Sequence, residues 1–173
     1  MTNTLEAGLD ALAATLGARL LAEGLVLATA ESCTGGWVAQ AVTAIAGSSA
    51  WFDRGFVTYS NEAKQELLGV PLATLEAHGA VSGETAAAMA RGVLAHSRAD
   101  LCVSITGVAG PAGGSEAKPV GTVWFGFGRR DGRLFTRRCL FAGDRRTIRA
   151  SAVDFALRAL LELAQGREPP SSG

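Results

Sequence analysis

The strongest candidates for chemistry in this sequence are Ser32, Cys33 and Thr34, which follow an apolar run. The run Leu25–Leu27 continues as Ala-Thr-Ala-Glu-Ser-Cys-Thr-Gly-Gly over residues 28–36. This pattern predicts a buried strand that ends in a turn, with a helix beginning near Gly35. Ser32 is then a candidate nucleophile with Glu31 as a nearby acid. The unpaired amides of the first helical turn could hold an anion or stabilise an oxyanion.

A structural interpretation of the same turn competes with the catalytic one. Thr34 could serve only as the N-cap of the helix, and caps are far more common than catalytic serines. The segment also lacks the G-x-S-x-G pattern of the nucleophile elbow of α/β-hydrolases. Its spacing alone therefore favours a strand-to-helix turn.

A second candidate cluster is Tyr-Ser-Asn-Glu-Ala-Lys at residues 59–64, where a strand over Trp51–Ser60 gives way to a short helix capped by Asn61. A desolvated Lys64 could lose its proton near neutral pH and act as a general base. Tyr59 could then relay the proton or orient the lysine. The alternative is a solvated lysine on the helix surface, which is the common environment of lysines.

A glycine-rich loop follows the apolar run Leu101–Ile105, which predicts a second buried strand. If the two buried strands are parallel, Thr106 and Gly107 lie at the same sheet edge as Ser32, where open α/β sheets bind ligands. Glycines let backbone amides approach a ligand closely. The loop could equally be a surface loop without a ligand, and it is not a P-loop, since G-x-x-x-x-G-K-[ST] is absent.

The last candidate is Gly-Asp-Arg-Arg at residues 143–146, with Asp144 as the cap of a long C-terminal helix. An arginine at a helix start suits a phosphate group, so Arg145 is a candidate substrate ligand. A simple cap with solvated arginines is the alternative. His78 and His96 have no metal-ligand partner at a useful spacing, so no metal site is predicted.

The composition sets outer limits on the function. The chain has 173 residues, 48% of them hydrophobic, with 16 basic and 16 acidic side chains. These values predict one folded domain over residues 1–165, with a flexible tail over 166–173, and argue against nucleic-acid binding by bulk charge. Three widely spaced cysteines, no evident signal peptide and no membrane-length apolar run predict a cytoplasmic protein without membrane contact.

Early alternation of helices and strands, followed by a hairpin around Asp131-Gly132, predicts an α/β fold: a three-layer α/β/α sandwich with a mixed β-sheet. Leucines at helical spacing predict an amphipathic first helix, from Leu5 to Leu20. Ser82 is expected to begin an alanine-rich helix that reaches about His96. An exposed apolar surface on the first helix would favour a homo-oligomer.

Together these segments resemble the C-terminal domain of the CinA family, the nicotinamide-nucleotide amidases. The resemblance runs from about Leu5 to Leu163 and consists of seven segments in order: A-E-S-C-T-G-G (30–36), G-S-S-A (47–50), Y-S-N-E-A-K (59–64), G-A-V-S (79–82), T-G-V-A-G-P (106–111), K-P-V-G (118–121) and G-D-R (143–145). Some members of the family carry an additional N-terminal domain, and the length of this chain suggests the stand-alone form.

The resemblance implies a hydrolase that converts nicotinamide mononucleotide and water to nicotinic acid mononucleotide and ammonia. Ser32 is then the nucleophile, Lys64 the base and Tyr59 its assistant. Arg145 binds the substrate phosphate, and no metal or cofactor is required. The other residues expected to contact the substrate lie in the two loops beside the nucleophile: Glu31, Cys33, Thr34, Gly35, Gly36, Thr106 and Gly107.

Two rival functions remain for comparison. One is a non-catalytic nucleotide-binding module linked to competence or the DNA-damage response, as the family name suggests. The other is a short-chain dehydrogenase that uses Tyr59 and Lys64. That family has three residues between its tyrosine and lysine, whereas four separate them here, and no G-x-G-x-x-G follows the first strand.

Overall fold

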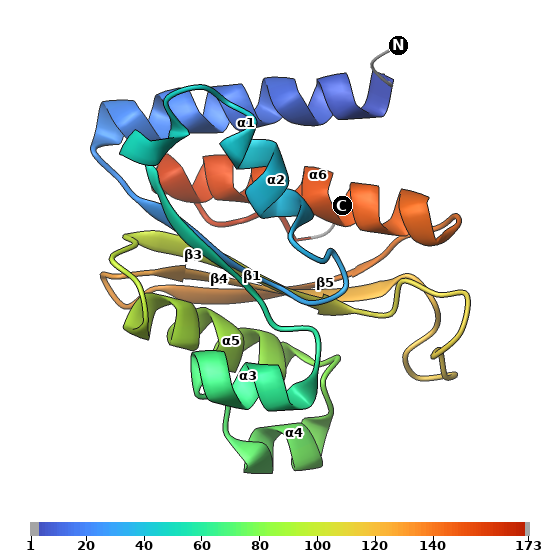
Figure 1. Cartoon of the computed structure of the whole chain (residues 1–173). Helices are drawn as coiled ribbons and strands as arrows, with labels where there is room; N and C mark the ends of the chain where they lie inside the picture. Colours follow the sequence, from blue (N-terminus) through green and yellow to red (C-terminus); the bar gives the residue numbers. More distant parts are fainter. Residues whose placement is uncertain (1–3, 172–173) are drawn as a thin grey trace.

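The computed structural model of the chain describes residues 4–171, which form a five-stranded sheet between two layers of helices (Figure 1). The sheet order is β2-β1-β3-β4-β5. β1 runs parallel to β2 and β3, whereas β4 is antiparallel to both of its neighbours, so the predicted mixed sheet is confirmed. The strands are β1 (Leu27–Glu31), β2 (Phe52–Val57), β3 (Leu101–Gly107), β4 (Thr122–Arg129) and β5 (Leu134–Leu140).

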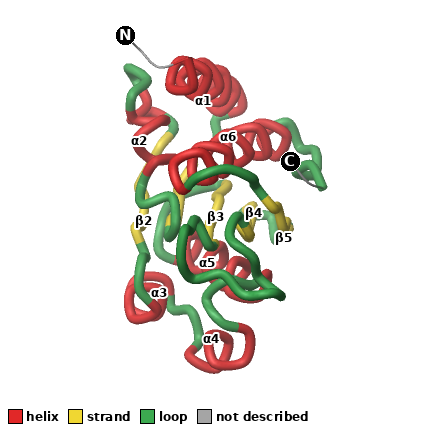
Figure 2. Tube along the Cα trace, turned by 90° about the vertical axis from the view of Figure 1, so that its right-hand side faces the viewer, coloured by secondary structure: helices red, strands yellow, loops and turns green. Residues whose placement is uncertain are grey.

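Helices cover both faces of the sheet, as the view in Figure 2 also shows, and this confirms the three-layer prediction. Helices α1, α2 and α6 lie on one face, and α3, α4 and α5 lie on the other. No helix within residues 4–171 combines the length and apolar character needed to cross a membrane. The helices are α1 (Thr4–Glu23), α2 (Trp37–Thr43), α3 (Asn61–Leu68), α4 (Leu72–His78), α5 (Gly83–Ala95) and α6 (Arg145–Ala164), with a 3₁₀ turn at Ser48–Ala50.

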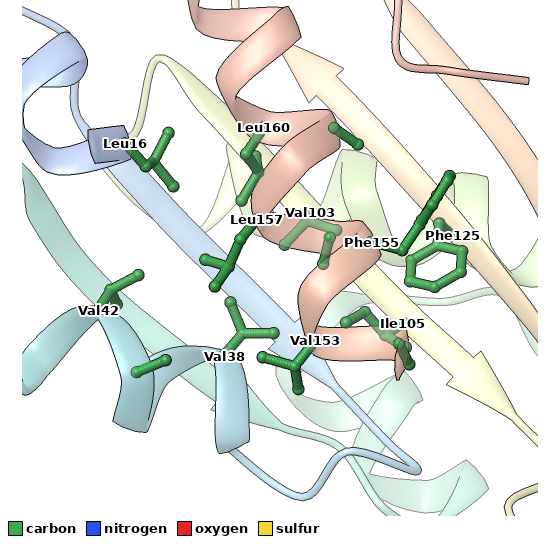
Figure 3. Close-up of a cluster of buried hydrophobic side chains, with 14 of the residues drawn as sticks. Leu16, Val38, Val42, Val103, Ile105, Phe125, Val153, Phe155, Leu157 and Leu160 are labelled. Atoms are coloured by element: carbon green, nitrogen blue, oxygen red, sulfur yellow. The ribbon is translucent and has the colours of Figure 1, made fainter. Parts of the chain in front are cut away.

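The larger hydrophobic core lies between the sheet and the layer of α1, α2 and α6 (Figure 3). Leu16 of α1 and Leu157 and Leu160 of α6 are fully buried in it, as is Phe125 of β4. The described leucines of the apolar stripe of α1, from Leu9 to Leu20, therefore pack inside the chain, and homo-oligomerisation stays a prediction. The side chain of Leu5 lies outside the described part of the chain.

Two predicted helix starts are wrong by one or two residues. The N-cap of α3 is Ser60, whose hydroxyl accepts the Ala63 amide, and Asn61 is the first helical residue. Helix α2 begins at Trp37 because Gly35 and Gly36 both have positive φ angles, 63° and 97°, which a right-handed helix excludes. The predicted caps Ser82 and Asp144 are confirmed.

The C-terminal segment packs against the sheet where the sequence predicts a flexible tail. Pro169 is buried, and the Arg137 guanidinium of β5 donates to the carbonyls of Pro169 and Pro170 at 2.9–3.2 Å. These bonds hold residues 166–171 beside β5. Residues 172–173 lie outside the described part of the chain.

The strand directions bring distant segments to one edge of the sheet. The parallel strands β1, β2 and β3 end there, and the antiparallel β5 also ends there and leads into α6. The residues that follow β1, β2 and β3, and those that begin α6, therefore converge. All four candidate clusters of the sequence lie at this edge.

A substitution at Gly92 tests how closely α5 packs against α3, the helix that carries Lys64. A Cβ at position 92 would overlap the Leu68 carbonyl oxygen and lie 2.7 Å from the Leu68 Cβ. We expect Gly92→Ala to lower the free energy of unfolding by about 1–3 kcal/mol, since neither backbone can give way. Gly8→Ala is the matched control: its Cβ meets nothing within 4 Å, and it should stabilise the helix by roughly 0.5–1 kcal/mol.

Chemical denaturation of both variants measures the difference. Equal stability of the two proteins would contradict the packing described for Gly92.

Candidate active site

Ser32 stands at the point where β1 ends, and hydrogen bonds to both neighbouring strands fix that point. The Ser32 amide donates to the Ile105 carbonyl of β3 at 3.0 Å. The Thr58 amide, just after β2, donates to the Glu31 carbonyl at 2.9 Å. Ser32 is only 8% exposed. The nucleophile candidate thus sits on rigid backbone and not on a free loop.

Lys64 of α3 reaches the serine from the other layer of the molecule. Its amine Nζ lies 3.2 Å from the Ser32 Oγ and 2.9 Å from the Thr58 carbonyl oxygen. The side chain is 1% exposed, so the solvated alternative is wrong. Burial lowers the pKa of the Lys64 amine and so favours the neutral form that a base requires. The pair has the geometry of a nucleophile with an adjacent base.

Cys33 lies beside the serine but is not set up as a nucleophile. Burial raises the pKa of the Cys33 thiol to about 11, which keeps the thiol protonated at neutral pH. Cys102 and Cys139 are also buried. In the part of the chain that is described, no three His, Cys, Asp or Glu side chains group closely enough to hold a metal ion.

The carboxylate of Glu31 points toward α2 and accepts hydrogen bonds from amides in the first turn of that helix. It accepts the Val38 amide at 2.8 Å and the Ala39 amide at 3.0 Å. Burial raises the pKa of this carboxyl group, while the two amide bonds act in the opposite direction. The side chain is 1% exposed. Glu31 is therefore the acid that caps α2, the role the sequence suggested for Thr34.

Backbone hydrogen bonds fix the turn between Ser32 and α2. The Gly35 amide donates to the Ser32 carbonyl at 3.0 Å, and the Trp37 amide donates to the Thr34 carbonyl at 3.2 Å. Gly36 precedes α2 in the left-handed conformation. Thr34, Gly35 and Gly36 therefore form the turn, and neither they nor Glu31 line the cavity beside Ser32.

That cavity has a volume of about 210 Å³ and brings together the candidate clusters from all four segments. Larger hollows of about 710 and 610 Å³ lie elsewhere on the molecule, but neither contains a serine beside a lysine. The residues that line the small cavity are Ser32, Cys33, Tyr59, Asn61, Lys64, Ala80, Val81, Thr106, Gly107, Ala109 and Arg145.

Several of these lining residues were not predicted as site residues. Asn61 was taken for a helix cap, and Ala109 lies farther along the glycine-rich loop than the two predicted positions. Ala80 and Val81 come from the segment before α5, which the Thr106 hydroxyl contacts by donating to the Ala80 carbonyl at 2.8 Å. The G-A-V-S segment quoted for the family resemblance was the one sequence signal that pointed to them.

Arg145 and Tyr59 form the mouth of the cavity. The Arg145 guanidinium donates to the Tyr59 hydroxyl at 3.1 Å and to the Gly110 carbonyl at 2.9 Å. Tyr59 is 63% exposed. Its hydroxyl therefore contacts the arginine, whereas the lysine amine contacts Ser32 and Thr58. The arginine joins three segments of the chain across the opening.

Comparison with known proteins gives matches over most of the chain. The family model described as the CinA C-terminal domain matches residues 9–164. Nicotinamide-nucleotide amidohydrolase PncC of Enterobacter agglomerans is 56% identical over 156 residues, which cover 90% of this chain and 95% of that protein. The protein of the same name in Escherichia coli K12 is 58% identical over 145 residues, covering 84% and 88%.

A solved structure has a similar fold. The competence/damage inducible protein CihA from Agrobacterium tumefaciens superposes with a TM-score of 0.88 at 46% identity, covering 90% of this chain and 95% of that one. The family match spans the sheet, both helical layers and every segment that lines the cavity. The chain belongs to the CinA C-terminal domain family.

Proposed function

We propose that this chain is a nicotinamide-nucleotide amidohydrolase that converts nicotinamide mononucleotide and water to nicotinic acid mononucleotide and ammonia, with Ser32 as its nucleophile. The observation that carries the proposal is the buried Lys64 amine, 3.2 Å from the Ser32 hydroxyl in a small cavity. The printed name of the two relatives supports the same activity. A module that only binds nucleotides has no need of a buried amine beside a serine.

In the first half of the reaction, the neutral Lys64 amine accepts the hydroxyl proton of Ser32. The serine oxygen forms a bond to the carboxamide carbon, and the carbonyl oxygen becomes an oxyanion. The Thr58 carbonyl accepts one N–H of the amine at 2.9 Å and so directs the lone pair toward the serine. The Lys64 ammonium then gives its proton to the leaving nitrogen, the C–N bond breaks and ammonia departs.

In the second half, water hydrolyses the acyl ester on Ser32. The neutral Lys64 amine takes a proton from the water as its oxygen attacks the acyl carbon. The new tetrahedral intermediate collapses, the serine oxygen leaves and takes the proton back from the Lys64 ammonium. The products are the free acid and the original pair of side chains.

The oxyanion is assigned to the side of the cavity that Thr106, Gly107 and Ala109 form. At the start of α2, three amides are already engaged: those of Val38 and Ala39 by Glu31, as described above, and that of Gly35 by the Ser32 carbonyl. Donors already bound within the protein are not available to a developing charge.

The size of the cavity limits which part of the substrate it holds. Drug-sized ligands occupy about 300–1,000 Å³, more than the 210 Å³ beside Ser32. The nicotinamide ring therefore enters the cavity, while ribose and phosphate remain at the mouth. Arg145 lies there with a planar guanidinium suited to a phosphate group. In this proposal Tyr59 orients Arg145 for the phosphate and does not relay protons for Lys64.

A cytoplasmic location belongs to the same proposal. The three cysteines are widely spaced in the sequence and odd in number, which suits a compartment in which thiols stay reduced. Catalysis here uses only side chains of the chain itself, with nicotinamide mononucleotide as the small-molecule partner.

Replacement of the nucleophile is the most direct test. We expect Ser32→Ala to reduce ammonia release from nicotinamide mononucleotide by roughly 10⁴-fold or more, with an unchanged melting temperature. Ser97→Ala is the matched control, since Ser97 precedes β3 at the opposite end of the sheet. Near wild-type turnover by a folded Ser32→Ala variant would falsify the nucleophile assignment.

Replacement of the base tests the pH dependence. Because burial lowers the pKa of Lys64, its amine loses its proton at a lower pH than a solvated lysine does. We expect kcat/KM of the wild type to rise with pH through this pKa and then level off. Lys64→Met should remove most of the rate together with this rise. A residual activity with the same pH profile would identify another group as the base.

The stability of the Lys64→Met variant provides an independent control. A buried lysine whose pKa is lowered destabilises the folded state below that pKa, and the penalty disappears above the pKa of the unfolded chain. Melting temperatures from about pH 6 to about pH 10 should therefore favour the variant most at the acid end. A constant difference across this range would contradict the desolvation of Lys64.

Replacement of Arg145 tests the phosphate contact. Arg145→Ala should raise KM for nicotinamide mononucleotide about ten- to a hundred-fold, the value of a charge-assisted contact of roughly 1.5–3 kcal/mol. Nicotinamide riboside lacks the phosphate, so it should be a poor substrate of the wild type and lose little more with the variant. Steady-state kinetics of the mononucleotide and the riboside, each with the wild type and with Arg145→Ala, isolates the contribution of the contact between Arg145 and the phosphate. Equal losses for both substrates would mean that Arg145 does not contact the phosphate.

A further inference from the structure

A second arginine of α6 contacts the nucleophile corner from outside the cavity. The Arg149 Nε donates to the Cys33 carbonyl at 3.0 Å, and its Nη2 donates to the Thr34 carbonyl at 3.0 Å. Arg149 stands one helical turn after Arg145 but is not among the residues that line the cavity. Its guanidinium therefore binds protein backbone at the two positions directly after Ser32.

These two hydrogen bonds fix the orientation of consecutive peptide groups. A peptide unit is planar, so holding its carbonyl oxygen also sets the direction of the amide that follows. The planar guanidinium presents donors in a rigid fork, which matches two adjacent carbonyls in a way that an ammonium group cannot. Both carbonyls belong to the turn in which Gly35 and Gly36 adopt left-handed conformations.

The arginine is itself held in place by α2. Its guanidinium carbon lies 5.5 Å from the centre of the Trp37 ring, at the first residue of that helix. A Cβ on Gly35 would come within 3.3 Å of the Arg149 Nη2, so the backbone lies close against the guanidinium. The fork is therefore packed on two sides and cannot swing into the solvent without losing both contacts.

We propose that Arg149 is a positioning residue for the amidase reaction, which holds the turn after Ser32 so that the serine oxygen stays aligned with the Lys64 amine. The inference rests on the proposed function, since it assigns Arg149 to the same serine. Glu31 binds the amides at the far end of this turn, and Arg149 binds the carbonyls at its near end. A shift of about 1 Å in the nucleophile is enough to reduce a rate about 100-fold.

The test compares Arg149→Ala and Arg149→Lys with Arg158→Met. Arg158 is an exposed arginine on the same helix that pairs with Asp154 one turn away, so it controls for charge and helix stability. We expect kcat for nicotinamide mononucleotide to fall about 10- to 100-fold in both Arg149 variants, with KM within about threefold of the wild type. Guanidinium ion added to Arg149→Ala should restore part of kcat, because the truncated side chain leaves room for it.

Two results would overturn the proposal. An unchanged kcat in folded Arg149 variants would reduce the arginine to a structural role. A rise in KM for the mononucleotide, but not for nicotinamide riboside, would make Arg149 a phosphate ligand. If Arg149→Ala does not fold, Arg149→Lys decides by the same criteria, since it keeps the charge and loses only the fork.

A second readout does not depend on the identity of the substrate. A fluorophosphonate probe transfers its phosphonyl group to the Ser32 oxygen and releases fluoride and a proton, so its rate reports on the alignment of Ser32 with Lys64. We expect slower labelling of both Arg149 variants and a wild-type rate for Arg158→Met. If the wild type is labelled but releases no ammonia from nicotinamide mononucleotide, the proposed function fails, and slower labelling of the Arg149 variants then supports only the alignment of Ser32 with Lys64. Equal labelling of all the proteins overturns the inference alone.

Discussion

The removal of one lysine amine from water is the constraint on which the rest of this site depends. An amine in an apolar environment favours its neutral form, and only the neutral form can take a proton from a serine. Lys64 is buried on α3, and that helix packs closely against α5 at Gly92. Ser32 comes from the opposite side, at the end of β1. The proposed reaction takes place at this edge of the sheet, where Lys64 of α3 meets Ser32.

The turn after Ser32, the proposed nucleophile, is held by side chains of opposite charge. A carboxylate can bind only the donors of the backbone, and Glu31 takes the amides at the start of α2. A guanidinium can bind only the acceptors, and Arg149 takes the carbonyls just after Ser32. Each charge is satisfied by backbone dipoles, so neither needs a counter-ion in the cavity. The serine is therefore surrounded by an ordered turn before any substrate arrives.

The sequence predicts the order and type of the elements well, because periodicity and caps are local properties. Ser82 and Asp144 cap their helices as their positions indicate. The burial of Lys64 could not be derived in this way, since it depends on contacts between α3, α5 and the strand ends. Arg149 was missed for the same reason: its partner Cys33 lies 116 residues away in the chain. Glu31 was taken for a substrate ligand because a strand-end acid gives no sign of which way it turns.

The occupation of the α2 helix end by Glu31 has a consequence for the product. A free helix N-terminus attracts anions, and deamidation turns a neutral carboxamide into a carboxylate beside Ser32. Because Glu31 already neutralises that helix end, the new negative charge gains no attraction there. Burial lowers the pKa of the Lys64 amine beside it, which also weakens the attraction of that amine for an anion. For the proposed reaction, the helix end therefore adds nothing to the binding of the acid over that of the amide.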